Sequence, residues 1–515
     1  MKKISTTDIS GVLAKSFLQS PLTLPLIFLI LFLGFYAVTH IPRNENPPMV
    51  VSGATVIFPV PGANKREIEE GIIKPFQKKL KEITGIYHIM GTAEDNSGII
   101  TIVFNSGENQ EDSNIKVYDK IIKNLDLLPA KAITPIIKTL DTDTDIPIVS
   151  IAFYSPDNRV NIIDLTKRAK NIAYELNTLE DVSSAKTIGG RLEQYNILLD
   201  LHKLYQYRLS VGQIVQSLKS LSTITPSDKV YTLDNKIVRF KVKKGVLSTS
   251  DIENTQLTNV EGQNVYLKEI AAVSKGSNIQ LKEESYLTVP NVISSTQQVT
   301  LIISKAKGSN GVVVTDRILE TLKSMAPELQ KSGVSYLITR NNGERANHAI
   351  NELIMHIFIT IAIIMLLLMF TLGIRESIAV AITIPLILAI TVLVTYVTGQ
   401  SIHRVTLLSY LLSLGILVDA AIIVIENIHR HMNEHGAKNK SLGQICIEAT
   451  DEIGKPTNIA TFAIIITIVP ILVITQLSGE FTKAIPYNVS TAMIASLFVA
   501  YIFTPYLANK LLKKH

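Results

Sequence analysis

Six apolar stretches stand out along the chain, and a long polar region, residues 42–347, separates the first stretch from the other five. A helix rises about 1.5 Å per residue, so about 20 residues cross the hydrocarbon core of a bilayer. Each stretch has roughly that length and therefore predicts a membrane-spanning helix. The stretches are Leu22–Val38, Ile350–Leu372, Ser377–Thr398, Val405–Ile428, Pro456–Gln476 and Ile485–Ala508.

The charges around these stretches predict how the spans are oriented. The first stretch follows basic residues and continues to Val38 without a small-residue cleavage site, so we expect an uncleaved span with its N-terminus inside. Cytoplasmic loops are enriched in Lys and Arg. The loops and tail that this topology places inside contain Arg375, Arg430, Lys438, Lys440, Lys510, Lys513 and Lys514. Residues 42–347 are then expected on the outer side.

The outer region alternates strand-like and helix-like patterns. Val50–Val60 is rich in β-branched residues, and residues 65–82 repeat apolar positions every three or four residues, as an amphipathic helix does. Two strands, Tyr87–Ile89 and Ile99–Phe104, and a helix over Glu111–Leu128 follow. This order predicts a split βαβ, ferredoxin-like sandwich whose helices cover one face of the sheet.

A second sandwich with the same pattern is predicted further along the chain, in two separated halves. Its strands and helices are expected at residues 146–153, 163–179, 299–304 and 312–325. The interval has strands of its own at 194–199 and 238–242 and a helix at 211–221, so it is interpreted as an inserted subdomain. The two sandwiches resemble an internal repeat.

These patterns together predict an α+β membrane protein with six transmembrane helices and one large outer domain. A polar, amphipathic segment at about 435–453 is expected to form a helix along the inner membrane surface. The predicted segments are 1–41 (N-terminus and first span), 42–140 (first sandwich), 141–188 and 277–347 (the two parts of the second sandwich), 189–276 (inserted subdomain) and 348–515 (spans two to six).

Composition narrows the classes of function. The net charge of +6 is modest for 515 residues and no basic run with interleaved aromatics occurs, so nucleic-acid binding is not indicated. The single cysteine, Cys446, excludes an intramolecular disulfide. His429, His431 and His435 do not share one helical face and are interpreted as a basic inner flank rather than a metal site. No phosphate-binding glycine loop, catalytic triad context or zinc spacing appears, so we predict a transporter that uses an ion gradient and no cofactor.

The fourth span carries a carboxylate near its middle, Asp419. Ionised Asp at a helix centre is disfavoured by roughly 2.5–3.5 kcal/mol on insertion scales, so such groups usually face a bundle interior or a water-filled path. Gly415 lies one turn earlier on the same face and allows a neighbouring helix to approach closely. Asp419 is therefore the candidate proton carrier. The alternative is a packing aspartate that a neighbour satisfies.

Three further polar residues accompany Asp419 in this span. Ser413 is a candidate for holding a relay water, although small hydroxyl residues in spans more often pack or bond to the backbone. Glu426 lies two turns after Asp419 on the same face and is a candidate for the inner mouth of a proton path. The favoured interpretation is that Glu426 and Asn427 end the span and hydrogen-bond a neighbouring helix.

Residues 415–427, GILVDAAIIVIEN, resemble the fourth-span signature of resistance-nodulation-division (RND) efflux permeases, G-x-x-V-D-D-A-I-V-V-V-E-N. IPRNENP at residues 41–47 resembles the I-P-x-E-x-P motif that follows the first span of that family. The run FPVPGANKREIEEGIIKPFQKKLKEITGI at 58–86 resembles the first porter subdomain. LGIRESIAVAITIPL at 372–386 and FTPYLANKLL at 503–512 resemble later segments, so the resemblance covers nearly the whole chain.

The resemblance implies an inner-membrane pump with two porter subdomains and a docking subdomain inserted in the second. It also implies a trimer that works with a periplasmic adaptor and an outer-membrane channel. In that family, protonation of the fourth-span aspartates drives the porter cycle. Asp419 matches the first aspartate of the pair, whereas the second matches Ala420, as in the heavy-metal branch of the family.

Family permeases have two homologous halves and twelve spans, and the lysine that pairs with the aspartate lies in the second half. This chain matches the first half, and no predicted span contains an interior Lys or Arg to pair with Asp419. An unpaired buried charge is costly. We expect a separate second-half chain to supply the cation; the alternatives are that two copies pair, or that Asp419 stays protonated.

The sequence leaves the substrate open between small molecules and metal ions. Drug-exporting relatives line the second porter subdomain with phenylalanines, and the matching strands here offer only Phe153 and Tyr154 as candidate substrate-binding residues. Two other interpretations remain: a secretion-type protein-translocation accessory subunit, and a non-transporting remnant of a split pump gene. The run that follows Pro61 counts against the first, and Ala420 is consistent with the second.

Overall fold

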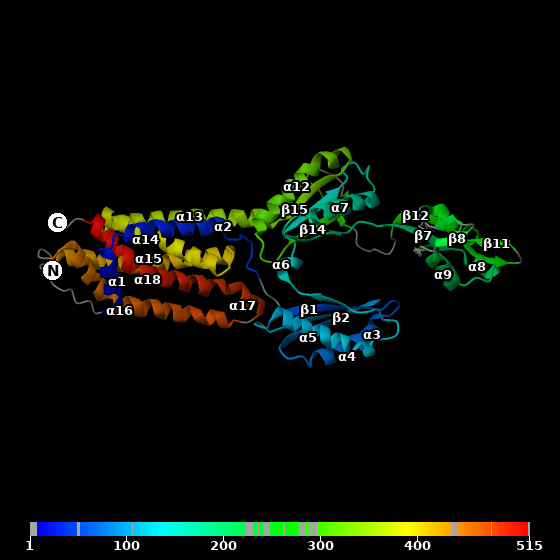
Figure 1. The fold of residues 1–515 in the computed structure, drawn as a ribbon, viewed down its shortest axis with the longest axis horizontal. Coiled ribbons are helices and arrows are strands. Elements are labelled where there is room, and N and C mark those ends of the chain that lie inside the picture. Colours follow the sequence, from blue (N-terminus) through cyan, green and yellow to red (C-terminus); the bar gives the residue numbers. More distant parts are fainter. Residues whose placement is uncertain are drawn as a thin grey trace.

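A computed structural model of the protein describes residues 8–48, 52–105, 107–222, 230–233, 236–239, 248–260, 263–277, 285–288, 296–434, 440–474 and 476–512. The molecule is elongated (Figure 1): a helical bundle forms one end, two α/β sandwiches lie beyond the bundle, and a smaller unit forms the other end. Both chain termini lie at the end of the bundle that is remote from the sandwiches. This arrangement gathers the large polar region on one side of the bundle.

Six helices in the described part of the chain are long and apolar enough to cross a membrane, and each coincides with a predicted apolar stretch. They are α2 (Thr23–His40), α13 (Asn342–Thr371), α14 (Ile374–Val397), α15 (Arg404–Asn433), α16 (Leu442–Ile468, continued by a 3-10 turn over Val469–Val473) and α18 (Ala484–Leu511). Helices α15 and α18 pack against each other and are the most buried, whereas α13 and α16 expose most of their side chains. A short helix, α17 (Gln476–Thr482), precedes α18.

The first sandwich is a four-stranded antiparallel sheet with strand order β2-β3-β1-β4. Its elements are β1 (Gly53–Pro59), α3 (Lys65–Ile68), α4 (Lys74–Leu80), β2 (Ile86–Glu94), β3 (Ser97–Phe104), α5 (Gln110–Ile122), a 3-10 turn (Leu125–Leu127) and β4 (Ile136–Thr139). One helix was expected over residues 65–82. A wide π turn, Glu69–Ile73, interrupts it before Pro75, which cannot donate a helical hydrogen bond.

The second sandwich has the same strand order. Its elements are β5 (Val149–Tyr154), α7 (Ile162–Asn177), β6 (Val182–Ile188), β14 (Thr296–Lys305), α12 (Gly311–Lys331) and β15 (Ser335–Asn341). β14 pairs with β5 and β6, and β5 also pairs with β15, so the order β6-β14-β5-β15 matches that of the first sandwich position by position. The short β13 (Ser285–Leu287) pairs antiparallel with one end of β14, and α6 (Thr142–Asp145) precedes β5. Topology therefore supports the internal repeat, which sequence identity alone is too weak to show.

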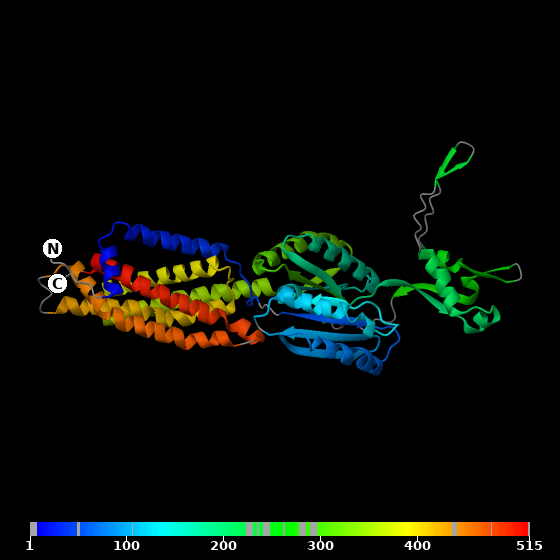
Figure 2. The same ribbon diagram turned by 60° about the horizontal axis from the view of Figure 1, so that its bottom comes forward.

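The inserted subdomain leaves and returns through one antiparallel strand pair, β7 (Glu193–Leu199) and β12 (Ala271–Ser277). Figure 2 shows it extending away from the sandwiches. Its other elements are α8 (Leu201–Gln206), α9 (Val211–Ser222), β8 (Val230–Leu233), β9 (Lys236–Arg239), α10 (Thr249–Glu253), β10 (Gln256–Val260), β11 (Gln263–Tyr266) and α11 (Leu267–Ile270). Of the strand expected at 238–242, residues 240–242 lie outside the described residues.

The separate surface helix that was expected at about 435–453 is not seen as a separate element. Residues 435–439 lie outside the described residues, and the rest belongs to α16, which begins after the Ser441 cap and runs through Pro456 into the fifth span as one helix. The helix α1 (Ile9–Leu18) packs against this inner part of α16, so that a Cβ on Gly11 would overlap Asp451. Tertiary burial therefore replaces the membrane surface as the partner of the amphipathic face.

Candidate functional site on helix α15

Helix α15 begins with a buried histidine cap. The imidazole Nδ1 of His403 accepts a hydrogen bond from the backbone N–H of Thr406 at 3.3 Å. Burial lowers the pKa of His403 from 6.5 to about 4, so the side chain is neutral at physiological pH and supplies no cation to the span. The helix then continues for 30 residues, which carries it past Glu426 and Asn427.

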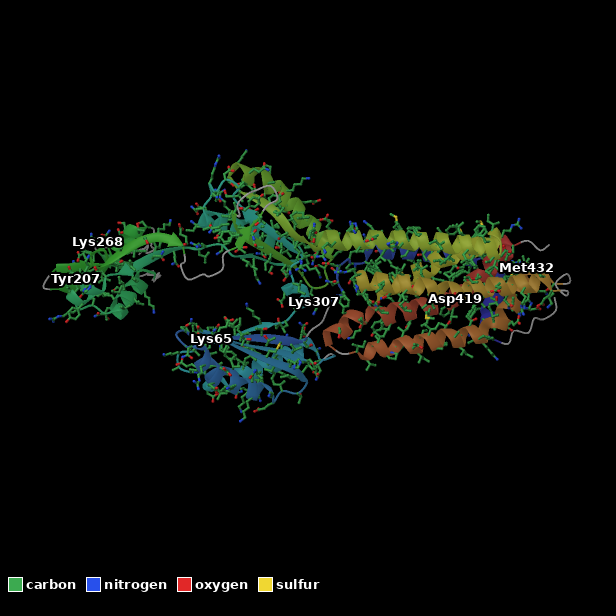
Figure 3. The ribbon with its side chains drawn as sticks, turned by 180° about the vertical axis from the view of Figure 1, so that it is seen from behind. Lys65, Tyr207, Lys268, Lys307, Asp419 and Met432 are labelled. Carbon is green, nitrogen blue, oxygen red and sulfur yellow. The ribbon has the colours of Figure 1, made fainter. Side chains whose placement is uncertain are left out.

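Helix α15 has a buried face and an exposed face. The buried face packs against α18, α16 and α14. On the other face, exposed side chains recur every three or four residues, and we call this set the exposed stripe of α15: Leu408, Leu412, Gly415, Asp419, Ile423 and Glu426. Asp419 lies about halfway along the bundle (Figure 3). The carboxylate therefore faces outward from the bundle rather than into its core.

Asp419 has no hydrogen-bond or ion-pair partner among the residues that the structure describes. Gly415, one turn away on the same stripe, is equally open, since a Cβ added there would meet no atom within 4 Å. The close neighbour that Gly415 was expected to accommodate does not come from the described part of this chain. A carboxylate and a bare backbone patch thus lie side by side on an uncovered helix face at membrane depth.

The accompanying residues have different roles from Asp419. The hydroxyl of Ser413 is fully buried and donates to the backbone carbonyl of Tyr410 at 2.8 Å, so it packs rather than holding a relay water. Asn427 donates from Nδ2 to the carbonyl of Ala449 at 2.8 Å and so joins α15 to α16, as expected. Glu426 makes no such bond among the described residues and stays on the exposed stripe.

A buried polar cluster on the opposite side of α15 was not anticipated from the sequence. The hydroxyl oxygens of Tyr410 and Thr395 lie 2.8 Å apart, and Thr395 donates to Oδ1 of Asn488 at 2.9 Å. These side chains come from α15, α14 and α18 and are each 2% exposed. The sequence shows polar residues in three apolar spans. It does not show which of them come together, because that depends on how the helices pack. The cluster fixes the register of three spans and leaves Asp419 on the other face.

The two candidate substrate residues in the second sandwich differ in their exposure. Phe153 is completely buried in the core between the sheet and its helices, with its ring 6.3 Å from that of Tyr336. Tyr154 ends β5 and is half-buried. Phe153 is therefore a packing residue in this structure, because inward-facing positions of a strand alternate with outward-facing ones.

The inner histidines pair with carboxylates. His429 Nδ1 lies 3.3 Å from Glu376, and His431 Nε2 lies 2.6 Å from Glu452. His435 lies outside the described residues. Within the described ranges, no three His, Cys, Asp or Glu side chains converge as metal ligands would.

Comparison with known proteins assigns the chain to a family. Residues 13–515 match the family model described as AcrB/AcrD/AcrF. The match covers nearly every residue, including the uncovered carboxylate of α15 and both sandwiches. The chain belongs to this family of RND efflux permeases. Membership counts against the secretion-type accessory subunit, because relatives in this family are named as efflux transporters.

Individual relatives agree with this membership. The chain is 25% identical to protein HelA of Legionella pneumophila over 94% of its own length and 46% of that protein. It is 23% identical to the cation efflux system protein CusA of Escherichia coli, over 92% of its own length and 45% of CusA. It is also 23% identical to the toluene efflux pump membrane transporter TtgB of Pseudomonas putida, over 97% of its own length and 47% of TtgB. The chain thus spans about half the length of the curated relatives it matches.

Proposed function

We propose that this RND chain forms one half of a proton-driven export permease of the inner membrane. Asp419 carries the proton, and a second six-span unit, expected on a separate chain, covers the exposed stripe of α15. The porter sandwiches bind the substrate on the periplasmic side. The complete pump is a trimer that works with a periplasmic adaptor and an outer-membrane channel.

The observation that carries this proposal is the uncovered position of Asp419. An ionised carboxylate at the centre of a span costs roughly 2.5–3.5 kcal/mol on insertion scales, and lipid offers it no partner. A second unit that brings a cation to the stripe would lower this cost, and Gly415 would let its helix come close. When Asp419 takes up a proton, the attraction to that cation is lost, so protonation shifts the packing of the two units.

The sequence, the fold and the relatives agree with either of two substrate classes. Among the relatives, CusA is named for cations and TtgB for toluene. The described porter residues provide no cluster of metal ligands and no aromatic-lined cleft at Phe153. The substrate is therefore either a metal ion or a small organic compound, and we propose that it binds between the sandwiches.

The test is the substitution Asp419→Asn, which keeps the size of the side chain and removes its ability to ionise. Cells that express this variant are expected to lose resistance to whichever metal ions or organic compounds the unchanged protein exports. The native mass of the gently extracted complex, with its co-purifying second six-span chain, is expected to stay the same. The control is Ser409→Ala on the buried face of α15, where the hydroxyl donates a hydrogen bond to the Val405 carbonyl of its own helix.

Proton-dependent export that survives in Asp419→Asn would refute the role of this carboxylate. Purification of the chain alone, without a second six-span unit and without export, would instead support the interpretation as a non-transporting remnant.

A further inference from the structure

The segment that follows the first span lies across the outer ends of two later spans. We call residues 41–47 the outer strap. Arg43 and Ile402 form a parallel β-bridge, in which the N–H of Asn44 donates to the Ile402 carbonyl at 3.0 Å and the N–H of Ile402 donates to the Pro42 carbonyl at 2.9 Å. The strap is thereby fixed to the loop that leads directly into α15.

Glu45 of the outer strap binds two arginines from different helices. Its Oε1 accepts a hydrogen bond from Nη2 of Arg404 at 2.8 Å. The same oxygen forms an ion pair with Nη2 of Arg345, at 3.0 Å. Arg404 is the first residue of α15, and Arg345 lies in the first turn of α13. The Glu45 side chain is only 7% exposed, whereas both arginines are about half-exposed or more. One buried carboxylate therefore holds the outer ends of α13 and α15 together, through a charge-assisted hydrogen bond from Arg404 and an ion pair with Arg345.

The start of α13 is fixed to the second sandwich. β15 runs into α13 without a loop, and the N–H of Asn342 donates to the carbonyl of Ile148 at 2.9 Å. The strap also touches this sandwich directly, because Oδ1 of Asn44 accepts from the N–H of Gly311 at the start of α12 at 3.1 Å. Any displacement of the strap is thus transmitted to α12 of the second sandwich and to the start of α13.

A small cavity with both polar and apolar lining residues adjoins these contacts. It has a volume of about 70 Å³, and its lining includes Asn44, Glu45, Lys305 and Asn342. A space of this size is large enough for roughly two waters. Where waters bridge polar groups, hydrogen bonds can exchange partners while the helices on either side move as rigid bodies.

We propose that Glu45 is a positioning residue that couples α15, the helix of Asp419, to α13 and the second sandwich. This coupling rests on the proposed function, in which proton uptake by Asp419 changes the packing of α15. When the packing of α15 changes, the pair Arg404–Glu45 moves the strap, and the strap moves the start of α13 through Arg345. Removing the Glu45 charge leaves two guanidinium groups facing each other and breaks this connection.

The first experiment measures the connection itself, independently of transport. Spin labels at His348→Cys on α13 and Leu408→Cys on α15 report the distance between the two outer ends by pulsed electron paramagnetic resonance, with the chain in lipid nanodiscs. Cys446 is buried and stays in place. The distance distribution is expected to broaden about two-fold in Glu45→Gln and in Arg345→Gln, because neither variant retains the charge pair.

Two controls separate this effect from general loosening. Arg345→Lys keeps a positive charge and a donor for Glu45 and is expected to retain the narrow distribution. Glu352→Gln removes an exposed carboxylate on the same helix, 4.0 Å from His356, and is also expected to retain the narrow distribution. An unchanged width of the distance distribution in both Glu45→Gln and Arg345→Gln would overturn the proposal. Arg345→Gln changes only an exposed side chain, so this variant is expected to fold.

The second experiment tests transmission to the porter. Labels at Lys65→Cys in the first sandwich and Asp157→Cys in the second report their separation, and Asp419→Asn imitates the protonated carboxylate. Asp419→Asn is expected to shift this separation, and the shift is expected to disappear when Glu45→Gln is added. A shift that persists in the double variant overturns the proposal. No shift with Asp419→Asn alone would contradict the proton coupling, while the width measurement still decides the role of Glu45.

Discussion

At the scale of single residues, the buried cap of α15 predicts a pH dependence of stability. The pKa of His403 falls from 6.5 to about 4 on folding, so between these pH values the unfolded state binds more protons than the folded state. Stability therefore rises with pH across this window and is unaffected by His403 above it. The size of the effect is about 3 kcal/mol.

The substitution His403→Asn tests this dependence, because Asn is a good helix cap that does not titrate. The melting temperature of the purified chain is expected to rise less steeply between pH 4 and 6.5 in this variant than in the unchanged protein. His348→Asn, at an exposed histidine on α13, serves as the comparison. Parallel melting curves for His403→Asn and the unchanged protein would show that His403 is not the titrating group.

Residue-level prediction from sequence works where the signal lies within one span. Asp419 is conspicuous because a charge interrupts an apolar run, and its site could be located without the fold. The sequence could not show that Asp419 faces outward and lacks a partner among the described residues, since that depends on which face of α15 the neighbouring helices cover. The same holds for Glu45, whose two arginines lie about 300 and 360 positions further along the chain.

At the scale of elements, glycines on two spans distinguish an occupied helix face from an open one. A Cβ at Gly34 of α2 would lie 2.4 Å from the Cβ of Ala389 on α14, whereas a Cβ at Gly415 would meet nothing within 4 Å. Gly34→Ala is expected to destabilise the chain by about 1–3 kcal/mol through overpacking. Gly415→Ala is expected to leave the chain alone as stable as before or slightly more stable.

The pair of variants therefore separates folding from assembly. Thermal unfolding of the chain in detergent should show the loss only for Gly34→Ala. Gly415→Ala should instead weaken co-purification of the second six-span unit, because it fills the gap left for the neighbouring helix. Equal destabilisation of the isolated chain by both substitutions would mean that the stripe is packed against this chain itself.

Element boundaries show where local pattern yields to tertiary packing. The polar residues at about 435–453 predict a separate surface helix, because their amphipathic face has no partner nearby in the sequence. In the structure, α1 and α18 cover that face, and the helix passes through Pro456 without ending. The partner of the face is α1, near the other end of the chain, so it is not nearby in the sequence.

At the scale of the whole molecule, the repeat is visible in topology rather than in sequence. Both sandwiches have the same strand order, yet the fourth strand of the first, β4, has only four residues and was not predicted. The second sandwich is split by the inserted subdomain. Its core nevertheless closes without the insert, since the residues buried around Phe153 and those of the inserted subdomain form separate clusters.

This separation predicts that the inserted subdomain can be removed without unfolding the rest. Glu193 and Ser277 pair at the base of β7 and β12, so their Cα atoms lie about 5 Å apart and a short Gly–Ser linker can replace residues 193–277. The contact of Lys167 with Glu193 is lost, but a surface ion pair contributes roughly 0–1 kcal/mol. The shortened chain is expected to melt within a few degrees of the original.

Assembly is expected to respond differently from folding. If the inserted subdomain holds protomers together, as its resemblance to a docking subdomain implies, the native mass of the shortened protein should fall below that of the trimer while its helical content per residue rises. A shortened chain that aggregates would contradict the independence of the second sandwich. A trimer that persists would place the contacts between protomers in the bundle or the sandwiches, where the exposed faces of α13 and α16 are the available surfaces.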